Sequence, residues 1–296
     1  MNKKNIWLIN QYSYPPGKSG WRRHFDLFRC FDKDKYNVDI ICGSFLHNSE
    51  NQHILEENEK EKLIKAEGIK YHILRVMTYS KYIDRIIAMI QFFFKVIFFS
   101  KKLLKESKPD IIIASSPHPF NGLAGMYLAK KYRCPFVIEI RDLWPETWVA
   151  MGATTKKSII YKVFAYIEKK LYKNANKIIT LTANKDYYTS IGINEKKVEI
   201  ISNGVDLEKY DSLLKEESPV KLLENKFNVL YTGAHGTANC LDNILEVAKL
   251  IKNDDIVFNF IGEGEKKEEL ITIKTKLENL NSHKEEIGLM EEAVEK

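Results

Sequence analysis

A cluster of polar and aromatic side chains follows directly after an apolar, β-branched run at residues 136–140. It consists of one cation, two carboxylates and two indoles: Arg141, Asp142, Glu146, Trp144 and Trp148. Such a run is typical of a strand buried in a parallel sheet, and open α/β sheets bind ligands just beyond the carboxyl ends of their strands. The cluster therefore predicts a site for a polar ligand, with Arg141, Asp142 and Glu146 as candidate catalytic residues. The alternative is a solvated turn that contains an Arg–Asp pair.

A histidine occupies a similar position one strand earlier. The segment Ser115-Ser-Pro-His-Pro-Phe120 follows another apolar strand candidate, so His118 is expected at the same edge of the sheet as Asp142. A neutral imidazole there can hydrogen-bond a hydroxyl group or stabilise charge that develops during a reaction. A lone histidine is otherwise usually structural or solvated, and the sequence leaves both readings open.

Candidate phosphate-binding residues follow the first strand candidate. The segment Tyr14-Pro-Pro-Gly-Lys-Ser-Gly20 contains Gly17 and Gly20, which permit close approach to the backbone, and leads into Arg22 and Arg23. Free N–H groups at the start of a helix, with two arginines beside them, suit a phosphate or pyrophosphate. The segment matches neither a Walker loop nor G-x-G-x-x-G, and a proline-rich turn explains it nearly as well.

The elements that would position these residues alternate between strands and helices. The expected strands are at residues 5–10, 38–42, 71–74, 111–114, 136–140, 177–181 and 198–201. The expected helices are near residues 21–31, 83–105, 121–132, 156–172 and 184–191. This alternation predicts an α/β fold with a doubly wound parallel sheet over residues 1–205.

A second doubly wound domain is expected to begin at residue 227, after a polar hinge or linker at residues 206–226. Its predicted elements are two strands, each followed by a glycine-containing loop, and one helix between them: 228–232, 241–251 and 256–261. Residues 266–296 contain no aromatic residue and predict only helical, Lys- and Glu-rich sequence. We therefore expect residues 227–296 to form a partial domain.

The composition limits the class of protein. The chain has 296 residues, of which 44% are hydrophobic, and a net charge of +6, which permits an anionic partner. Four cysteines without paired spacing, and no histidine cluster at zinc-ligand spacing, favour a cytoplasmic protein without a metal site. The apolar run at residues 6–9 is too short for a secretory signal. Dispersed lysines without a recognition motif argue against nucleic acid as a partner.

Residues 83–105 form the most apolar part of the chain. Lysines close its end, and Gln91 and Lys95 interrupt its longest apolar run, so a bilayer-spanning helix is disfavoured. The segment suits a helix in the membrane interface, with its lysines on anionic lipid. A helix packed on the sheet explains it equally well.

Several motifs in this order resemble glycosyltransferase family 4, in its O-antigen and capsule branch. They are Arg141-Asp-Leu-Trp-Pro-Glu146, Ser115–Phe120, Ser202-Asn-Gly-Val-Asp206 and Tyr231-Thr-Gly-Ala-His-Gly236. The resemblance implies a GT-B fold, in which two Rossmann-like domains hold the acceptor and the nucleotide-sugar. It also implies a retaining, metal-independent transferase without a cofactor. The expected substrates are a UDP-linked sugar and a lipid-linked glycan acceptor, at the inner face of the plasma membrane.

Residue by residue, the resemblance places Asp142 beside the transferred sugar, with Arg141 where many relatives have histidine and His118 near the donor sugar. Asn203 lies at the expected hinge. The expected donor-loop residues are those of the second domain: Gly233, His235, Gly236, Gly262, Glu263 and Gly264. Their backbone N–H groups would approach the diphosphate.

The chain also departs from the family pattern. Cys240 stands where this branch has glycine, and neither the Glu-x7-Glu pair of the donor pocket nor the cations that contact the diphosphate are evident. The alternative function is therefore a truncated, inactive remnant that binds acceptor, lipid or a partner. A nucleotide-sugar epimerase or dehydrogenase fits less well, because G-x-G-x-x-G is absent after the first strand.

Overall fold

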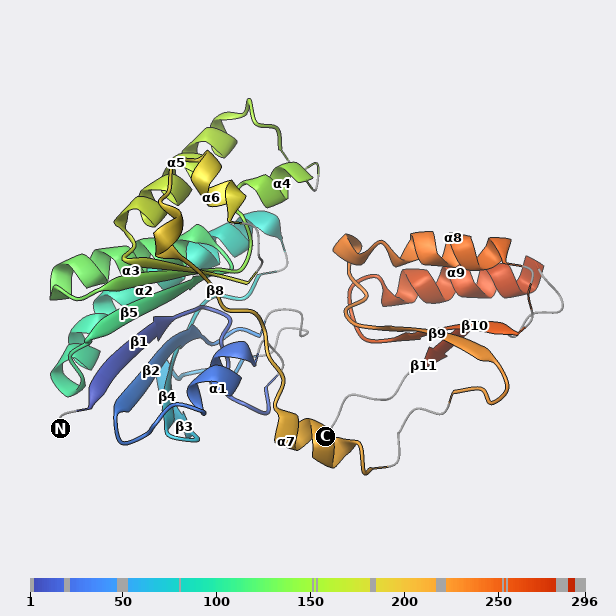
Figure 1. Cartoon of the computed structure of the whole chain (residues 1–296), viewed down its shortest axis with the longest axis horizontal. Coiled ribbons are helices and arrows are strands. Elements are labelled where there is room, and N and C mark those ends of the chain that lie inside the picture. Colours follow the sequence, from blue (N-terminus) through green and yellow to red (C-terminus); the bar gives the residue numbers. More distant parts are fainter. Residues whose placement is uncertain are drawn as a thin grey trace. The chain divides into compact units, whose positions relative to one another are not determined.

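The computed structural model describes residues 3–18, 22–46, 53–79, 81–150, 152, 154–181, 185–216, 222–251, 253, 255–280 and 287–290. The chain divides into two compact units, Met1–Asp206 and Leu207–Lys296. Each unit contains a sheet and helices, as the ribbon in Figure 1 shows. The α/β fold class predicted from the alternation of strands and helices is confirmed.

The first unit is built on one sheet with the strand order β3-β4-β2-β1-β5-β6-β7-β8. Its strands are β1 (Lys4–Ile9), β2 (Tyr36–Gly43), β3 (Glu61–Ala66), β4 (Ile69–Leu74), β5 (Ile111–Ser116), β6 (Phe136–Ile140), β7 (Lys177–Thr180) and β8 (Val198–Ile200). All pair in parallel except β3, which pairs antiparallel with β4 at the edge. Because parallel strands share one carboxyl edge, the residues that follow β1, β4, β5 and β6 meet at that edge.

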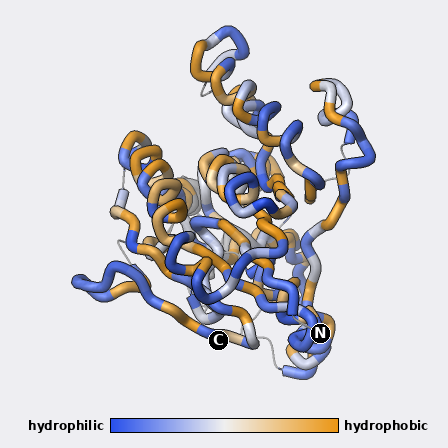
Figure 2. Tube along the Cα trace, turned by 90° about the vertical axis from the view of Figure 1, so that its left-hand side faces the viewer, coloured by the Kyte–Doolittle hydropathy of each residue, from blue (hydrophilic) through white to orange (hydrophobic). Residues whose placement is uncertain are grey.

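Helices cover both faces of this sheet (Figure 1). They are α1 (Arg23–Phe28), α2 (Tyr82–Glu106), α3 (Pro119–Tyr132), α4 (Glu146–Ala150), α5 (Ile159–Asn174) and α6 (Asp186–Ser190). The tube in Figure 2 shows apolar and hydrophilic stretches alternating along the helices, so that each helix can turn an apolar side to the sheet. This distribution is what burial of apolar area requires.

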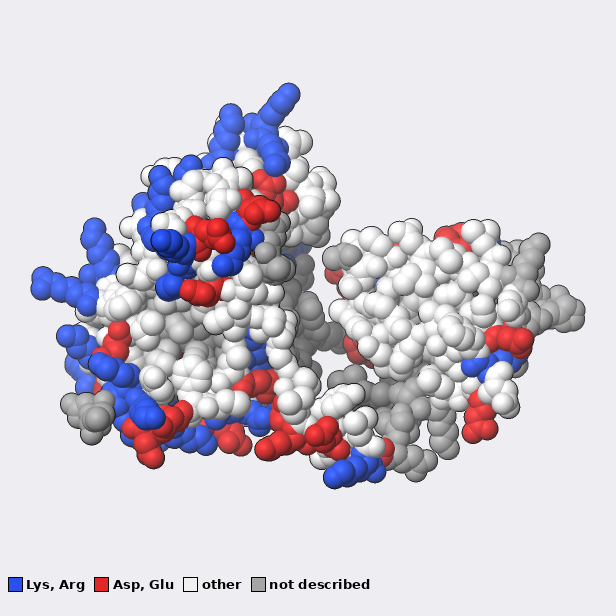
Figure 3. Space-filling view, in the orientation of Figure 1, with Lys and Arg blue, Asp and Glu red and all other residues white. Residues whose placement is uncertain are grey.

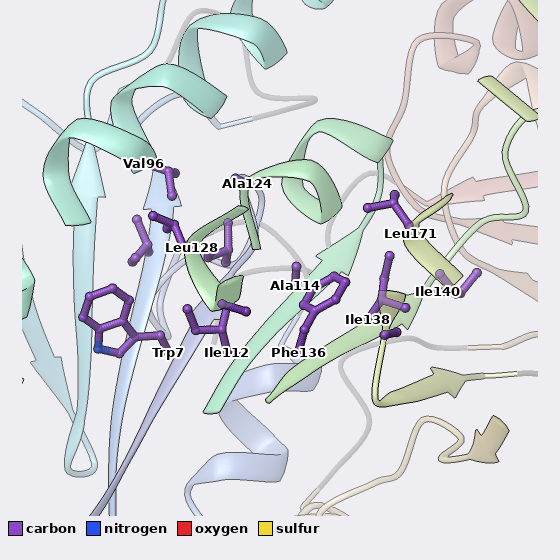
Figure 4. Close-up of a cluster of buried hydrophobic side chains, with 14 of the residues drawn as sticks. Trp7, Val96, Ile112, Ala114, Ala124, Leu128, Phe136, Ile138, Ile140 and Leu171 are labelled. Carbon is purple, nitrogen blue, oxygen red and sulfur yellow. The ribbon is translucent and has the colours of Figure 1, made fainter. Parts of the chain in front are cut away.

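The main core lies between the sheet and the helices α2, α3 and α5. Figure 4 shows Trp7, Ile112 and Phe136 of the strands facing Val96 and Leu128 of the helices. Trp7, Ile112, Val96 and Leu128 are fully buried, and the Trp7 ring packs edge-on against Tyr132 at 5.6 Å. Burial of each such side chain contributes roughly 1.5–3 kcal/mol, which makes this layer the main support of the strand ends.

The seven strands predicted for the first unit are present, but the sequence reading missed β3. Its side chains alternate between exposed and half-buried, as expected for an edge strand with only one face on the core. A second difference concerns β6, because the run that reads as apolar contains the buried Glu139.

The second unit has a three-stranded parallel sheet in the order β11-β10-β9. Its elements are α7 (Leu207–Leu213), β9 (Phe227–Thr232), α8 (Leu241–Leu250), β10 (Ile256–Ile261), α9 (Lys267–Leu280) and β11 (Ile287–Met290). Two expectations need correction. Residues 266–296 contribute the strand β11 as well as a helix, and the linker at 206–226 contains the helix α7.

Helix α2 packs on the sheet, as one of the two interpretations of residues 83–105 predicted. One face packs on the sheet through buried Ala88, Phe92 and Val96. The opposite face leaves an apolar stripe exposed, with Ile83 at 70% and Phe98 at 66% exposure. Within the described residues, no helix has the length and apolar content needed to cross a bilayer.

Candidate functional site

The carboxyl ends of β5 and β6 place His118 and Asp142 at the same edge of the sheet. Ser116 pairs with Ile140 in the parallel register, and each of the two residues follows two positions later. The structure therefore brings these two side chains to neighbouring positions, as the sequence predicted. Their exposure to solvent differs, however, and this changes what each can do.

His118 is fully buried, and its Nε2 lies 3.0 Å from Oε1 of Gln11. The ring packs edge-on against Tyr12, which also follows β1. Burial lowers the pKa of His118 to about 3, and the nearby charge of Arg85 adds to this shift. The imidazole is therefore neutral, as expected, and because it is buried its contact with a sugar hydroxyl stays a prediction.

Asp142 is exposed at this edge, and Arg141 beside it is half-buried. The surrounding protein raises the pKa of Asp142, while the charges of Arg141 and Arg85 act in the opposite direction. Desolvation likewise lowers the pKa of the Arg141 guanidinium, although Glu139 and Asp142 favour its charged form. This arrangement gives one accessible carboxylate beside two cations, which can orient a hydroxyl group and a negatively charged ligand.

Glu146 is the first residue of α4, and its side chain contacts α5 and the segment before it. Its Oε1 accepts a hydrogen bond from the Tyr161 hydroxyl at 2.5 Å, and its Oε2 lies 3.0 Å from Nζ of Lys156. Burial would raise the pKa of Glu146, but these two partners outweigh it and hold the pKa below its ordinary value. The structure therefore gives Glu146 two partners within the protein, and its expected catalytic role stays a prediction.

The two indoles of the cluster also pack on this helix. Trp144 and Trp148 lie edge-to-face at 4.6 Å, and Trp148 contacts the ring of Phe164 at 4.8 Å. Both indoles are half-buried. Together with Glu146 they fix α4 against α5 and so set the shape of the loop that carries Asp142.

Arg23 contradicts the prediction of a phosphate-binding arginine. Its guanidinium is buried and donates from Nε to Oε1 of Glu139 at 2.8 Å. Its Nη atoms donate to the carbonyls of Ser202 and Ile201 and to Oδ1 of Asn203. These hydrogen bonds fix the segment after β8 against the sheet. Asn203 therefore contacts Arg23 of the same unit.

His24 completes this buried cluster, with Nε2 at 2.7 Å from the second Glu139 oxygen. Desolvation would raise the pKa of Glu139, but His24, Ser115 and Arg23 hold it well below its usual range. Glu139 is therefore a buried carboxylate with charged and polar partners on both oxygens. The sequence reading missed this cluster, although a glutamate inside a buried strand requires a partner.

The other predicted residues of the first loop lie near α1. Arg22 is exposed and its Nη2 is 3.4 Å from Oδ1 of Asp26. Gly17 has a φ of +81°, a left-handed conformation that favours glycine, and no atom within 4 Å of a side chain placed there. Gly20 lies outside the described residues.

The glycine-rich loops of the second unit bind each other. Gly233 N–H donates to the Ile261 carbonyl at 3.0 Å, and His235 N–H donates to the Glu263 carbonyl at 2.8 Å. A Cβ on Gly262 would lie 1.8 Å from the Gly233 carbonyl oxygen, so this glycine is required by close packing. The expected use of the Gly233 and His235 amides for a diphosphate is therefore corrected, since the protein already occupies them.

Three further residues of these loops are placed as follows. A Cβ on Gly264 would lie 2.5 Å from the His235 carbonyl oxygen, whereas Gly236 has only the Asn239 side chain nearby. Glu263 is exposed and pairs with Lys267 at 2.6 Å. The His235 ring is buried, and burial together with Lys267 lowers its pKa. Gly236 thus remains the predicted donor-loop position with the most space around it.

Among the described residues, no group of three or more His, Cys, Asp or Glu side chains is placed to hold a metal ion. On the face of the first unit drawn in Figure 3, basic side chains lie over the region of α5, at the far end of α3 and near the N-terminal end of the sheet, with acidic side chains among them. Positive charge is thus spread over this face and does not form a single patch.

Sequence comparison supplies the family. The profile described as Glycosyltransferase Family 4 matches residues 21–209, nearly the whole first unit. The chain belongs to glycosyltransferase family 4. Among its relatives, a probable glycosyltransferase of Pseudomonas aeruginosa, WbjE, is 24% identical over 177 residues, 58% of this chain and 44% of that protein. An uncharacterized glycosyltransferase of Methanocaldococcus jannaschii is 23% identical over 54% of this chain and 42% of its own length. The family 4 chain thus aligns with less than half the length of each.

Solved structures share the fold of this family 4 chain. Sucrose-phosphate synthase of Thermosynechococcus elongatus matches with a TM-score of 0.67 and 12% identity, over 98% of this chain and 71% of that one. The catalytic domain of starch synthase IV from Arabidopsis thaliana matches with a TM-score of 0.60 and 11% identity, over 100% of this chain and 75% of that one. HepE of Anabaena matches with a TM-score of 0.58 and 12% identity, over 97% and 68%. The predicted GT-B class of two Rossmann-like units is confirmed.

Proposed function

We propose that this family 4 chain takes part in sugar transfer from a nucleotide-sugar to a lipid-linked glycan acceptor in bacterial surface-polysaccharide synthesis. The observation that carries the proposal is the strand-end site of the first unit, where exposed Asp142 lies among Arg141, Arg85 and neutral His118. Asp142 would orient the acceptor hydroxyl or the transferred sugar, and the cations would favour the developing negative charge.

The donor is expected to be a nucleoside diphosphate sugar, with UDP as the nucleotide. HepE, a structural neighbour, was solved with UDP, and starch synthase IV was solved with ADP and acarbose. The family resemblance further favours transfer with retention of anomeric configuration, without a metal or another cofactor. In that chemistry the diphosphate would leave with help from backbone dipoles and cations.

The test is a transfer assay with bacterial membranes as the source of acceptor and a panel of radiolabelled UDP- and GDP-sugars. We expect label from one donor to enter the lipid fraction. The yield should be unchanged in EDTA, and the new linkage should have the same anomeric configuration as the donor. Asp142→Asn should reduce the rate roughly 100-fold. Asp34→Asn is the matched control, because Asp34 is exposed in the connection between α1 and β2, before the amino end of β2. This variant should leave the rate unchanged.

The alternative, a non-catalytic acceptor- or lipid-binding protein, is favoured by the Gly233 and His235 amides that the protein itself occupies. Isothermal titration with UDP- and GDP-sugars separates the two functions. Donor binding tighter than millimolar supports the transferase. Absence of transfer with every donor, alongside retained lipid binding, would support the alternative.

We further propose that α2 docks on the cytoplasmic membrane surface. Its exposed stripe follows helical spacing, with a side chain on every turn: Ile83, Ile87, Ile90, Phe94 and Phe98. Lys101 and Lys105 are exposed at the end of the helix, where they can reach anionic headgroups. A continuous exposed apolar stripe marks an interaction surface.

Vesicle flotation tests this surface. The protein should float with phosphatidylglycerol vesicles, less with phosphatidylcholine vesicles, and less at high salt. Phe94→Ser combined with Phe98→Ser should abolish flotation. Leu250→Ser, which removes an equally exposed apolar side chain from α8, should not, and equal loss in both variants would contradict the docking of α2.

A further inference from the structure

Among the residues that the structure describes, Arg85 forms no ion pair with a carboxylate. It is half-buried, its Nε is buried, and within the described part of the chain its side chain makes neither an ion pair nor a hydrogen bond. The arginines Arg22, Arg23 and Arg29 each pair with a carboxylate. A partly buried charge without a partner is unfavourable, so Arg85 is placed as a residue that a ligand anion would satisfy.

The position of Arg85 follows from the connection between β4 and α2. Because β4 is parallel to β1, α2 begins at the carboxyl edge, and Arg85 lies in its first turn, where its N–H bonds to the Lys81 carbonyl. Gln91 fixes the connection, since its Oε1 accepts a hydrogen bond from Met77 N–H at 2.8 Å. Arg85 therefore belongs to the same edge as Asp142 and His118, and its charge acts on both of them.

The two faces of α2 have different partners. Arg85 shares the helix face of buried Ala88, Met89 and Phe92, which is turned toward the sheet. The opposite face carries the exposed apolar stripe with Ile83 and Ile87. The start of α2 therefore joins a surface suited to lipid and a cation suited to phosphate within one helical turn.

We propose that Arg85 holds the phosphate of a lipid-phosphate acceptor, next to the carboxylate of Asp142. The proposal rests on the proposed function, because it takes the acceptor to be lipid-linked. Two buried polar atoms that have no hydrogen-bond partner among the described residues support a polar ligand at this edge, namely Nδ1 of His118 and Nε2 of Gln11. The planar guanidinium can donate two parallel hydrogen bonds to one phosphate, which a lysine cannot do.

Direct binding tests this assignment separately from sugar transfer. The probes are farnesyl phosphate, farnesol, inorganic phosphate and UDP, titrated into the whole chain and into Arg85→Gln. We expect the variant to bind farnesyl phosphate roughly 10- to 100-fold more weakly, with unchanged binding of farnesol and UDP. Lys130→Gln, which removes an exposed charge from α3, should bind all probes like the wild type.

The outcomes distinguish the sources of the anion. Equal binding of farnesyl phosphate by wild type and Arg85→Gln would overturn the proposal, and so would an equal loss for farnesol. A loss confined to UDP would assign Arg85 to the donor instead. If circular dichroism shows that Arg85→Gln does not fold, Arg85→Lys replaces it. This variant should bind farnesyl phosphate severalfold more weakly than the wild type. Undiminished binding would contradict the role of Arg85. The titration measures binding and not sugar transfer. Its result therefore tests the role of Arg85 even if the transfer assay detects no activity.

Discussion

At the scale of single residues, the first unit contains a buried carboxylate, Glu139, that has partners on both of its oxygens. Glu139 receives Arg23 and His24, and through Arg23 it also holds the chain that leaves β8. A buried ion pair of this kind contributes modestly when intact, because its desolvation offsets the attraction. Removal of one partner is costly, since it leaves the other charge buried and unpaired.

Glu139→Gln should therefore lower the free energy of unfolding by roughly 3 kcal/mol. Because the pKa of Glu139 is lowered in the folded state, its stabilising effect is present above the ordinary glutamate pKa of 4.5 and declines as the pH falls below it. Urea titrations at pH 7 and pH 4 measure both effects. Glu199→Gln, at an exposed pair with Lys177, should change stability by less than about 1 kcal/mol.

Glu168 of α5 gives the opposite dependence on pH. It is buried, its oxygens accept hydrogen bonds from the hydroxyls of Tyr172 and Tyr187, and burial raises its pKa to about 7. The folded state therefore binds a proton more tightly than the unfolded state between pH 4.5 and 7, and stability falls as the pH rises through this range.

Glu168→Gln should remove this dependence, because the amide does not titrate. We expect the wild type to lose on the order of 3 kcal/mol relative to the variant between pH 4.5 and pH 7.5. Thermal unfolding across this range measures the difference. Glu57→Gln, at an exposed position, should follow the wild type, and a parallel pH profile for Glu168→Gln would contradict the raised pKa.

At the scale of elements, α3 is held against the sheet by small residues. A Cβ on Gly125 would lie 2.7 Å from Cβ of Ala114 and 3.0 Å from the Phe136 ring. A Cβ on Gly122 would lie 2.8 Å from Leu171. This close approach fixes the helix that begins directly after His118, so the packing of α3 also sets the position of the imidazole.

Gly125→Val should lower the free energy of unfolding by at least about 1–3 kcal/mol, because the added atoms force α3 away from β5. The same displacement should expose His118, and its pKa by proton NMR should rise toward its ordinary value of 6.5. Gly204→Ala, where a Cβ meets no atom within 4 Å, should change neither quantity. An unchanged imidazole pKa in a folded Gly125→Val would contradict this coupling.

At the scale of the whole molecule, the chain is two compact units with separate cores. The core of the second unit is small and includes Leu245, Phe258 and Phe260. Its α8 begins with a strained residue, because Cys240 has a φ of 48° and ψ of 45°, a left-handed conformation that favours glycine. A cysteine at this position therefore has a conformational cost that a glycine would not have.

We expect calorimetry to resolve two transitions, one for each unit. Cys240→Gly should stabilise the second unit by about 1 kcal/mol and raise only its transition, by several degrees. Cys240→Ala keeps the Cβ and the strain, so it should give no gain. A single transition that shifts as a whole would show that the two units unfold together.

The fold class and the strand-end location of the site followed from local patterns in the sequence. Apolar runs of strand length, separated by helical stretches, predict a parallel sheet, and the edge at which Asp142 and His118 lie is then set by topology. The edge strand β3 was missed because its side chains alternate and are only half-buried. The family motifs added the GT-B class, since their order along the chain is specific.

The tertiary structure alone decided which polar groups form hydrogen bonds or ion pairs within the protein. The neighbours Arg23 and His24 are 116 and 115 positions from Glu139 in the sequence, and they meet it only in the folded chain. Similarly, only the packing of the two glycine loops shows that the amides of Gly233 and His235 donate to backbone carbonyls of the protein. Burial and pairing depend on long-range contacts, which a residue's neighbours in the sequence do not specify. For this reason the sequence did not predict Arg85 as a ligand-binding residue, whereas the structure shows that it forms no ion pair among the described residues.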